Sequence, residues 1–260
     1  LLASAFVANA APRAEKISWS DGGKTFDGYL VWDDASKAPR PGLVMVPNWY
    51  GVNDHAVAKA KTLAGKDYVI LLADVYGRGL RPANPDEAGK ASAAVYADPA
   101  AMRSRIRAAL ATLRGAAKLA PLDTRHIGAI GFCFGGAVAL ELARSGADLA
   151  GVASFHGNLG TKMPASAGVL KSPVLVMNGD HPLYRARTLA ALRETWESRK
   201  AGLAILVTEM PDPTGYGRVI RDASGRVTRV VEQNDCSEAE RGVREVNLGA
   251  YLADARTLFE

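Results

Sequence analysis

Cys133 stands in the middle of the hexapeptide Gly-Phe-Cys-Phe-Gly-Gly at residues 131–136. A mostly apolar run at 126–130 precedes this hexapeptide, and a second one at 137–143 follows it. A strand, a sharp turn between glycines and a helix would present the cysteine at a helix N-terminus, which favours its nucleophilic thiolate form. A small buried filler is the alternative role for this side chain, and the flanking glycines favour the turn. The sequence therefore predicts a cysteine nucleophile at position 133.

The acid and base that should serve this nucleophile come later in the chain in enzymes built on such a turn. Asp180 follows the apolar run 173–177 and is the predicted acid. The base should follow the next predicted strand, at 203–208, but residues 209–216 include no histidine. Asp212 is too acidic, unless it is buried, to replace an imidazole. The predicted triad therefore lacks its base, and turnover should be impaired.

Two histidines are candidates for the missing base. The chain has four histidines, at positions 55, 126, 156 and 181. His156 ends the predicted strand 151–156, which follows the predicted helix at 137–143. His181 lies in the same loop as Asp180. Either could supply an imidazole to Cys133. A surface position or a satisfied core position is the alternative role for both.

The elements that would carry these residues alternate between strands and helices up to about residue 180. This alternation is typical of an α/β fold with a mostly parallel sheet and helices on both faces. Strands are predicted at 17–20 and 25–32, which form an opening hairpin, and at 42–47 and 68–74. Helices are predicted at 56–65 and 99–119, and a strand with the sharp turn at 126–136. Beyond residue 174 the alternation continues once, through a helix at 186–199. It then gives way to a hairpin at 217–231 and a strand at 244–252.

Three segments together resemble the dienelactone hydrolase family. They are the hexapeptide at 131–136, the run Pro-Asn-Trp-Tyr-Gly-Val-Asn at 47–53, and the run Asp-Val-Tyr-Gly-Arg at 74–78. The likeness covers roughly residues 14–180. It implies an α/β-hydrolase fold and the hydrolysis of a small-molecule lactone or ester, with no cofactor.

The same resemblance implies roles for individual residues. The backbone N–H groups of Phe134 and Trp49 would form an oxyanion hole, which contributes about 3–4 kcal/mol in such sites. Arg78 would bind an acidic substrate through charge-assisted hydrogen bonds, and a solvated loop position is its alternative. The family usually carries Glu where Asn48 stands, so control of the resting Cys133 thiol must differ here.

A second resemblance begins near residue 174. The run Val-Leu-Val-Met-Asn-Gly-Asp-His-Pro-Leu at 174–183 is similar to bacterial N-acetylglucosamine-1-phosphate uridylyltransferases, as are the motifs at 212–218, 231–233 and 245–247. This likeness covers residues 174–260. The Gly-rich loop that cradles the triphosphate in that family, with its catalytic Lys, is not found in the sequence.

The second resemblance implies a sugar-nucleotide site with a metal. Asp180 and Asn247 would bind a catalytic Mg²⁺, and Gly217, Glu232 and Asn247 would line the sugar-nucleotide pocket. Mg²⁺ usually needs the substrate phosphates as well, so it is expected only under this alternative. The alternatives to a hydrolase are thus a uridylyltransferase fragment that binds a sugar nucleotide weakly, and a chimeric product without catalysis.

Composition changes at the same junction. Lys and Arg number ten each before residue 174, but one and eleven after it. Together with the change of motif and the missing histidine, this bias predicts a chimeric chain. The predicted parts are a truncated signal-peptide remnant at 1–10, a hydrolase body at 11–180, and a uridylyltransferase-like α/β segment with a hairpin at 181–260.

Net charge and the distribution of apolar residues limit the classes of partner that the chain can bind. The formal charge of +5 is not gathered into a basic patch, so nucleic acid binding is not expected. No stretch reaches the ~18 apolar residues of a membrane span. The apolar start ending in Ala-Asn-Ala at 8–10 is typical of a secretory signal. A periplasmic or secreted location is therefore expected, or a cytoplasmic one under the sugar-nucleotide alternative.

The two cysteines, Cys133 and Cys236, should be free thiols. The sequence leaves the oligomeric state open.

Overall fold

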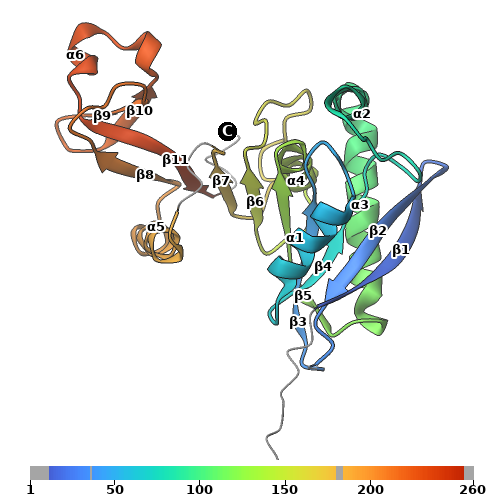
Figure 1. Cartoon of the computed structure of the whole chain (residues 1–260). Helices are drawn as coiled ribbons and strands as arrows, with labels where there is room; N and C mark the ends of the chain where they lie inside the picture. The colour runs from blue at the N-terminus through green and yellow to red at the C-terminus, as the bar shows by residue number, and fades with distance from the viewer. Residues whose placement is uncertain (1–11, 36, 180–183, 255–260) are drawn as a thin grey trace, which may run out of the picture. The chain divides into compact units, whose positions relative to one another are not determined.

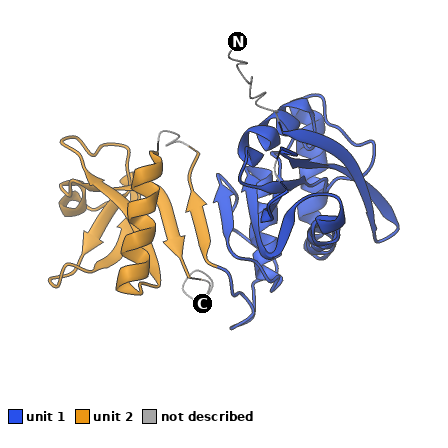
Figure 2. Ribbon diagram, turned by 90° about the horizontal axis from the view of Figure 1, so that it is seen from below, with its two compact units in different colours: residues 1–172 blue, residues 173–260 orange. Residues whose placement is uncertain are grey.

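The computed structural model describes residues 12–35, 37–179 and 184–254. The chain divides into two compact units, Leu1–Ser172 (unit 1) and Pro173–Glu260 (unit 2), which Figure 2 colours separately. The predicted signal-peptide remnant at 1–10 lies outside the described residues. Within the described ranges, no helix is both long enough and apolar enough to cross a membrane.

Unit 1 contains a sheet with a parallel centre (Figure 1). Its strands are β1 (Arg13–Asp21), β2 (Lys24–Trp32), β3 (Arg40–Val46), β4 (Val69–Leu72), β5 (Leu122–Phe132) and β6 (Val152–Phe155). They lie in the order β1-β2-β4-β3-β5-β6. The strands β4, β3, β5 and β6 are parallel to one another. The pairs β1–β2 and β2–β4 are antiparallel. The predicted α/β fold with a mostly parallel sheet is confirmed.

Helices cover both faces of this sheet. They are α1 (Asp54–Ala64), α2 (Pro85–Ala97), α3 (Pro99–Gly115) and α4 (Phe134–Arg144), with a 3₁₀ turn at Ala116–Lys118. Met45 of β3 belongs to a buried cluster with the alanines of α1. A Cβ built at Gly42 of the same strand would lie 3.3 Å from Leu113 Cδ2 of α3. Because residues an odd number apart in a strand face opposite sides, α1 and α3 cover opposite faces.

Side-chain caps fix where two of these helices begin. Asn84 accepts a hydrogen bond from the Glu87 backbone N–H at the start of α2, and Asp98 accepts one from the Ala101 N–H at the start of α3. The sequence analysis did not predict α2. It also predicted one helix over 99–119, whereas the α-helix ends at Gly115 and a 3₁₀ turn follows.

Unit 2 is built around the long strand β11. Its elements are β7 (Val174–Met177), α5 (Ala186–Arg199), β8 (Leu203–Glu209), β9 (Arg218–Arg221), β10 (Val227–Val231), a 3₁₀ turn (Gln233–Asp235), α6 (Glu238–Arg241) and β11 (Glu245–Ala253). Tyr251 of β11 lies opposite Val176 of β7 and also opposite Ile205 of β8, so these two strands flank β11. All pairings in the unit are antiparallel among the residues described. The predicted hairpin at 217–231 is confirmed as β9 and β10.

Candidate functional site

Cys133 occupies the sharp turn between β5 and α4. Its φ of 53° is in the left-handed region that non-glycine residues rarely adopt. The Cys133 N–H donates to the Phe155 carbonyl at 2.8 Å, and the Cys133 carbonyl accepts from the Gly136 N–H at 2.9 Å. Backbone in such a conformation costs on the order of 1–3 kcal/mol and concentrates at functional sites. The predicted strand–turn–helix elbow is therefore present around the cysteine.

The glycines around Cys133 are required by close backbone approach. A Cβ added at Gly131 would collide with the carbonyl group of Gly135. A Cβ added at Gly135 would collide with the carbonyl oxygens of Val46 and Pro47. Both contacts involve backbone, which cannot move aside as a flexible side chain can. Their steric role explains the spacing of the glycines on either side of the cysteine.

Aromatic side chains surround the first turn of α4. The buried ring of Phe134 stacks on Tyr76 at a centroid distance of 5.3 Å and meets Tyr96 edge-on at 5.4 Å. Burial is the main cause that raises the pKa of both tyrosines, and the nearby charge of Cys133 contributes. Both phenols therefore stay neutral at pH 7 and can donate hydrogen bonds. Tyr76 uses its hydroxyl to donate to the Trp49 carbonyl at 2.8 Å.

The backbone N–H groups of Trp49 and Phe134 are the two predicted oxyanion donors. Among the described residues, neither the Trp49 N–H nor the Phe134 N–H donates to another protein group. Trp49 lies in the turn after β3. Asn48, which stands where the resembled family has Glu, supports that turn by accepting from the Tyr50 N–H at 3.1 Å.

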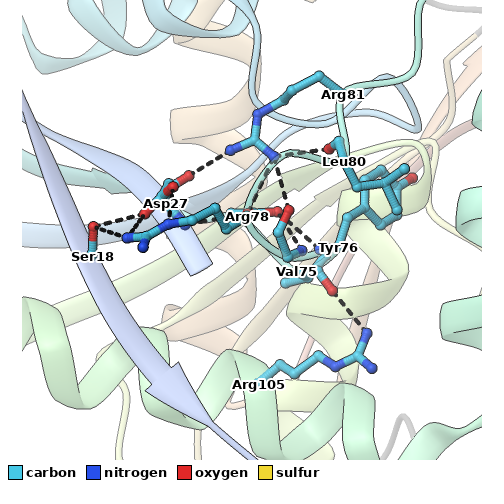
Figure 3. Close-up of polar contacts among 10 residues, drawn as sticks. Ser18, Asp27, Val75, Tyr76, Arg78, Leu80, Arg81 and Arg105 are labelled. Carbon is cyan, nitrogen blue, oxygen red and sulfur yellow. Dashed lines mark hydrogen bonds and ion pairs between the residues drawn. The ribbon is translucent and has the colours of Figure 1, made fainter. Parts of the chain in front are cut away.

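Arg78 is held by a carboxylate of the protein itself (Figure 3). Its Nε and Nη2 donate to the two carboxylate oxygens of Asp27 at 2.7 and 2.8 Å, and Nη2 also donates to Ser18 Oγ at 3.2 Å. The hydrogen bond from Arg78, followed by that from Ser18, lowers the pKa of Asp27 to about 2. A substrate carboxylate that used Nε and Nη2 of Arg78 would have to displace Asp27, whereas Nη1 donates to no group in these hydrogen bonds.

Asp74 organises the loop that carries Tyr76 and Arg78. Its buried Oδ1 accepts from the backbone N–H groups of Tyr76 at 2.9 Å and Gly77 at 3.2 Å. Its Oδ2 accepts from Arg81 at 3.3 Å. Arg81 also donates to the Asp27 carbonyl at 2.9 Å (Figure 3). The sequence analysis missed both Asp27 and Arg81. The loop resemblance at 74–78 included Asp74 but not its role.

No base is in hydrogen-bonding contact with the Cys133 sulfur in the part of the chain that the structure describes. His156 follows Phe155, the residue whose carbonyl holds the Cys133 N–H, and it is exposed with a φ of 59°. Within the described residues, no imidazole hydrogen-bonds the Cys133 sulfur. The predicted acid Asp180 and the second base candidate His181 lie outside the described residues.

A cavity of about 520 Å³ lies beside the first turns of α4. Its lining joins α2, α3 and α4 with the segment 158–162 and includes Tyr96, Met102, Ala137, Glu141, Asn158 and Lys162. Glu141 is almost fully buried and accepts from Arg103 Nε at 2.7 Å and from Arg144 Nη1 at 2.8 Å. The two arginines also donate to the carbonyls of Met163 and Leu159. This buried network ties the cavity wall to α4, and sequence reasoning missed it.

The residues of the second resemblance gather in unit 2. The Asn247 N–H donates to the Gly217 carbonyl at 2.9 Å. A Cβ at Gly217 would lie 3.0 Å from Glu232 Oε1. The three predicted sugar-nucleotide residues are therefore neighbours, although they come from β11, the start of β9 and the end of β10.

The predicted Mg²⁺ ligands do not make a metal site from the described residues alone. Asp180 lies outside them, and Asn247 Oδ1 already accepts from the Gly249 N–H at 3.0 Å. Asn247 Nδ2 donates to the Tyr251 hydroxyl. Mg²⁺ requires about six oxygen ligands in octahedral geometry. Because Asp180 lies outside the described residues, and Mg²⁺ takes further ligands from water and substrate phosphates, the predicted Mg²⁺ site stays a prediction.

Comparison with known proteins gives two family matches. The model of the dienelactone hydrolase family matches residues 26–207, and that of the nucleotidyl transferase family matches residues 160–257. Two different families therefore match adjacent and overlapping parts of the chain, and the predicted double resemblance is confirmed.

Solved structures resemble most of the chain. The structure of m3DLH has 35% sequence identity and a TM-score of 0.59, covering 74% of this chain and 79% of its own. A dienelactone hydrolase-like promiscuous phosphotriesterase from metagenomic libraries has 34% identity and a TM-score of 0.57, with the same coverage.

A curated relative resembles a shorter stretch. The bifunctional protein GlmU of Anaeromyxobacter sp. (strain K) is 47% identical over 90 residues, which is 35% of this chain. The chain spans only 18% of the length of that relative.

Proposed function

The chain belongs to the dienelactone hydrolase family, and on that premise we propose that Cys133 is the nucleophile of an ester or lactone hydrolase that acylates readily and turns over slowly. The observation that carries the proposal is the left-handed backbone of Cys133 between two sterically required glycines. A cysteine that only filled space would not need this strained turn.

The proposed acylation needs only groups that unit 1 supplies. The thiolate attacks the carbonyl carbon, and the N–H groups of Trp49 and Phe134 stabilise the resulting oxyanion. Collapse breaks the bond to the leaving oxygen, which departs as a phenolate when the substrate is an activated aryl ester. The acyl group then remains on Cys133 as a thioester. Hydrolysis of that thioester requires activation of a water molecule, which is the task of the missing base.

The test is a burst experiment with a p-nitrophenyl ester. We expect release of about one equivalent of p-nitrophenol per chain, followed by a slow phase, because acylation outpaces deacylation. Intact-mass measurement should show one acyl adduct. Cys133→Ala should abolish both signals, whereas Cys236→Ala, which removes the buried thiol of unit 2, should keep them. Equal burst amplitudes in the Cys133→Ala variant and the parent protein would refute the proposal.

Chemical rescue tests the missing base separately. Free imidazole should accelerate the slow phase at least about tenfold, because it can activate water at the thioester. It should leave the burst amplitude unchanged. His156→Gln decides whether the exposed histidine beside Phe155 contributes. A loss of the slow phase in this variant, restored by imidazole, would assign His156 as the base.

The phosphotriesterase among the similar structures suggests a second probe. Attack of Cys133 on an aryl phosphotriester would release the same phenolate and leave a phosphoryl group on sulfur. Running this probe beside the ester in the same burst assay shows which class of electrophile the site prefers.

A second candidate function concerns unit 2. The gathering of Gly217, Glu232 and Asn247 favours weak binding of a sugar nucleotide. UDP-N-acetylglucosamine with Mg²⁺ should then raise the melting temperature, as binding to the folded state does. Glu232→Ala should remove this shift. No shift at millimolar ligand would exclude this candidate and leave the hydrolase proposal untouched.

A further inference from the structure

Strand β8 has an edge without a partner strand. In the described part of unit 2, β8 pairs with β11 from Leu203 opposite Ala253 to Glu209 opposite Glu245, with a register shift at Leu206. No other described strand pairs with β8, which Figure 1 labels beside β11. A row of its backbone N–H and C=O groups therefore points away from β11.

Six of the seven residues of β8 lack the features that usually protect an edge strand. Residues 203–208 read Leu-Ala-Ile-Leu-Val-Thr and contain no charge, glycine or proline. Natural edge strands are usually short, charged, bulged or interrupted by proline, because an exposed apolar edge accepts further strands. An unprotected edge of this composition is therefore suited to strand addition.

An apolar groove runs along the same strand. It has a volume of about 720 Å³, and its lining includes Leu192, Leu203, Ile205, Val207, Val227 and Tyr251. Leu203 is 41% exposed and Val227 is 38% exposed, which is high for large aliphatic side chains. An added strand would place its own side chains beside these and remove them from water.

Charges at the two ends of β8 select one kind of occupant. Arg199 and Lys200 precede the strand, Glu209 ends it and Asp212 follows; all four are exposed. Among the described residues, none of the four forms an ion pair with another. A second β8 running antiparallel and centred on Ile205 would place Glu209 opposite residue 201, beside Lys200. A parallel copy would instead place like charges together.

We infer that β8 is a homodimer interface, formed by antiparallel addition of the β8 strand of a second copy. The pairing is self-complementary, so it closes after two copies instead of growing into a filament. It joins the two sheets through backbone hydrogen bonds, and the groove side chains add apolar contact. The inference rests on unit 2 alone and does not depend on the hydrolase proposal.

The first test is sedimentation velocity of the full chain under reducing conditions at about 1–100 µM, a range that separates weak from stable dimers. We expect a concentration-dependent dimer. Ile205→Lys should weaken it at least about a hundredfold, because Ile205 lines the apolar groove and two lysines would face each other at the centre of the pairing. Leu159→Lys is the matched control: it replaces an exposed leucine of unit 1 and should leave the dimer intact. Thermal unfolding of each variant verifies that the fold persists.

A charge exchange keeps the test decisive if Ile205→Lys fails to fold. Glu209→Arg alone, or Arg199→Glu with Lys200→Glu, should each weaken the dimer at least about tenfold through like-charge contacts. An equimolar mixture of the two variants should dimerise again, because every contact is then between opposite charges. A monomeric parent protein throughout this range, a dimer unaffected by these changes, or open-ended polymers would each overturn the inference.

Discussion

Both units combine strands with helices, but these strands and helices are buried to different degrees. In unit 1 all four residues of β4 are buried, and helices lie on both faces of the sheet. In unit 2 every residue of β8 is at least partly exposed, and α5 buries only Leu192 along its whole length. Unit 1 therefore has the packing expected of an independent core, whereas unit 2 leaves apolar surface for another partner. Matched substitutions in the two units can test this contrast.

The largest expected effect comes from the buried charge network of unit 1. Glu141→Gln should reduce the free energy of unfolding by about 4 kcal/mol, because it leaves two buried guanidinium groups without a counter-charge. Urea unfolding, with hydrogen exchange of α4 peptides to identify the unit, gives the measurement. In unit 2, Glu245→Gln should cost less than about 1 kcal/mol, since its partner Arg221 is 40% exposed. Equal losses would contradict the contrast.

Removal of a leucine side chain should have the next largest effect. Leu140 of α4 is completely buried, so Leu140→Ala should cost about 3 kcal/mol through lost burial and a residual cavity. Leu206→Ala in the partly exposed β8 should cost about 1 kcal/mol, because part of that side chain is already in water. The ratio of the two losses, measured by denaturant unfolding, is the quantity of interest. A larger loss in β8 would show that unit 2 is the better packed.

Glycine substitutions should give a smaller difference with a functional signature. Gly135→Ala should cost about 2 kcal/mol because the new Cβ meets two backbone carbonyls. It should also suppress acylation of Cys133, since the elbow must shift. Gly225→Ala in the β9–β10 turn meets no atom and should cost about 1 kcal/mol, from its φ of +83° alone. An unchanged ester burst in Gly135→Ala would show that acylation of Cys133 does not depend on the geometry of the elbow.

The smallest expected effect on the free energy of unfolding comes from the ion pair of Asp27 and Arg78, whose contribution depends on pH. The pKa of folded Asp27 is about 2, below the roughly 3.9 of an unfolded aspartate. The pair therefore stabilises the fold above about pH 4, and this contribution is lost as the pH falls towards 2. Because Arg78 is 58% exposed, Asp27→Asn should cost less than about 1 kcal/mol at pH 7. Unfolding curves of the two proteins should converge near pH 2, and a constant difference would contradict the assignment.

The same Asp27→Asn variant bears on the predicted role of Arg78. If the guanidinium binds substrate carboxylates, its release from Asp27 should lower the concentration of a carboxylate-bearing ester needed for half-maximal acylation. A neutral ester of the same size is the matched control. An equal effect on both esters would argue against a carboxylate anchor at this position.

Local patterns predicted much of the fold. The elbow, the central strands and the β9–β10 hairpin follow from apolar runs and from glycines, which act within a few residues. The missed helix α2 has a local signal too, since Asn84, Pro85 and Glu87 form a cap, a first-turn proline and an acidic first turn. A reading of caps as well as periodicity would have found it.

The site was less predictable because its contacts are distant in sequence. Asp27 lies 51 residues before Arg78, and Arg103 lies 38 residues before Glu141. Which charged groups meet depends on strand order and helix placement, and neither follows from local composition. Motif resemblance placed Arg78 at a loop, but only the assembled sheet brings Asp27 to it.

The elbow also bears on the order in which the chain is made. The groups that hold Cys133 in its conformation are the carbonyls of Val46, Pro47 and Phe155 and the adjoining glycines, all at or before Gly157. Synthesis runs from the N-terminus, and domains generally fold as units when they emerge. The backbone around the thiol can therefore take its final conformation before unit 2 has fully emerged from the ribosome. The conformation of Cys133 therefore depends on backbone groups of unit 1, whichever sequence follows Ser172.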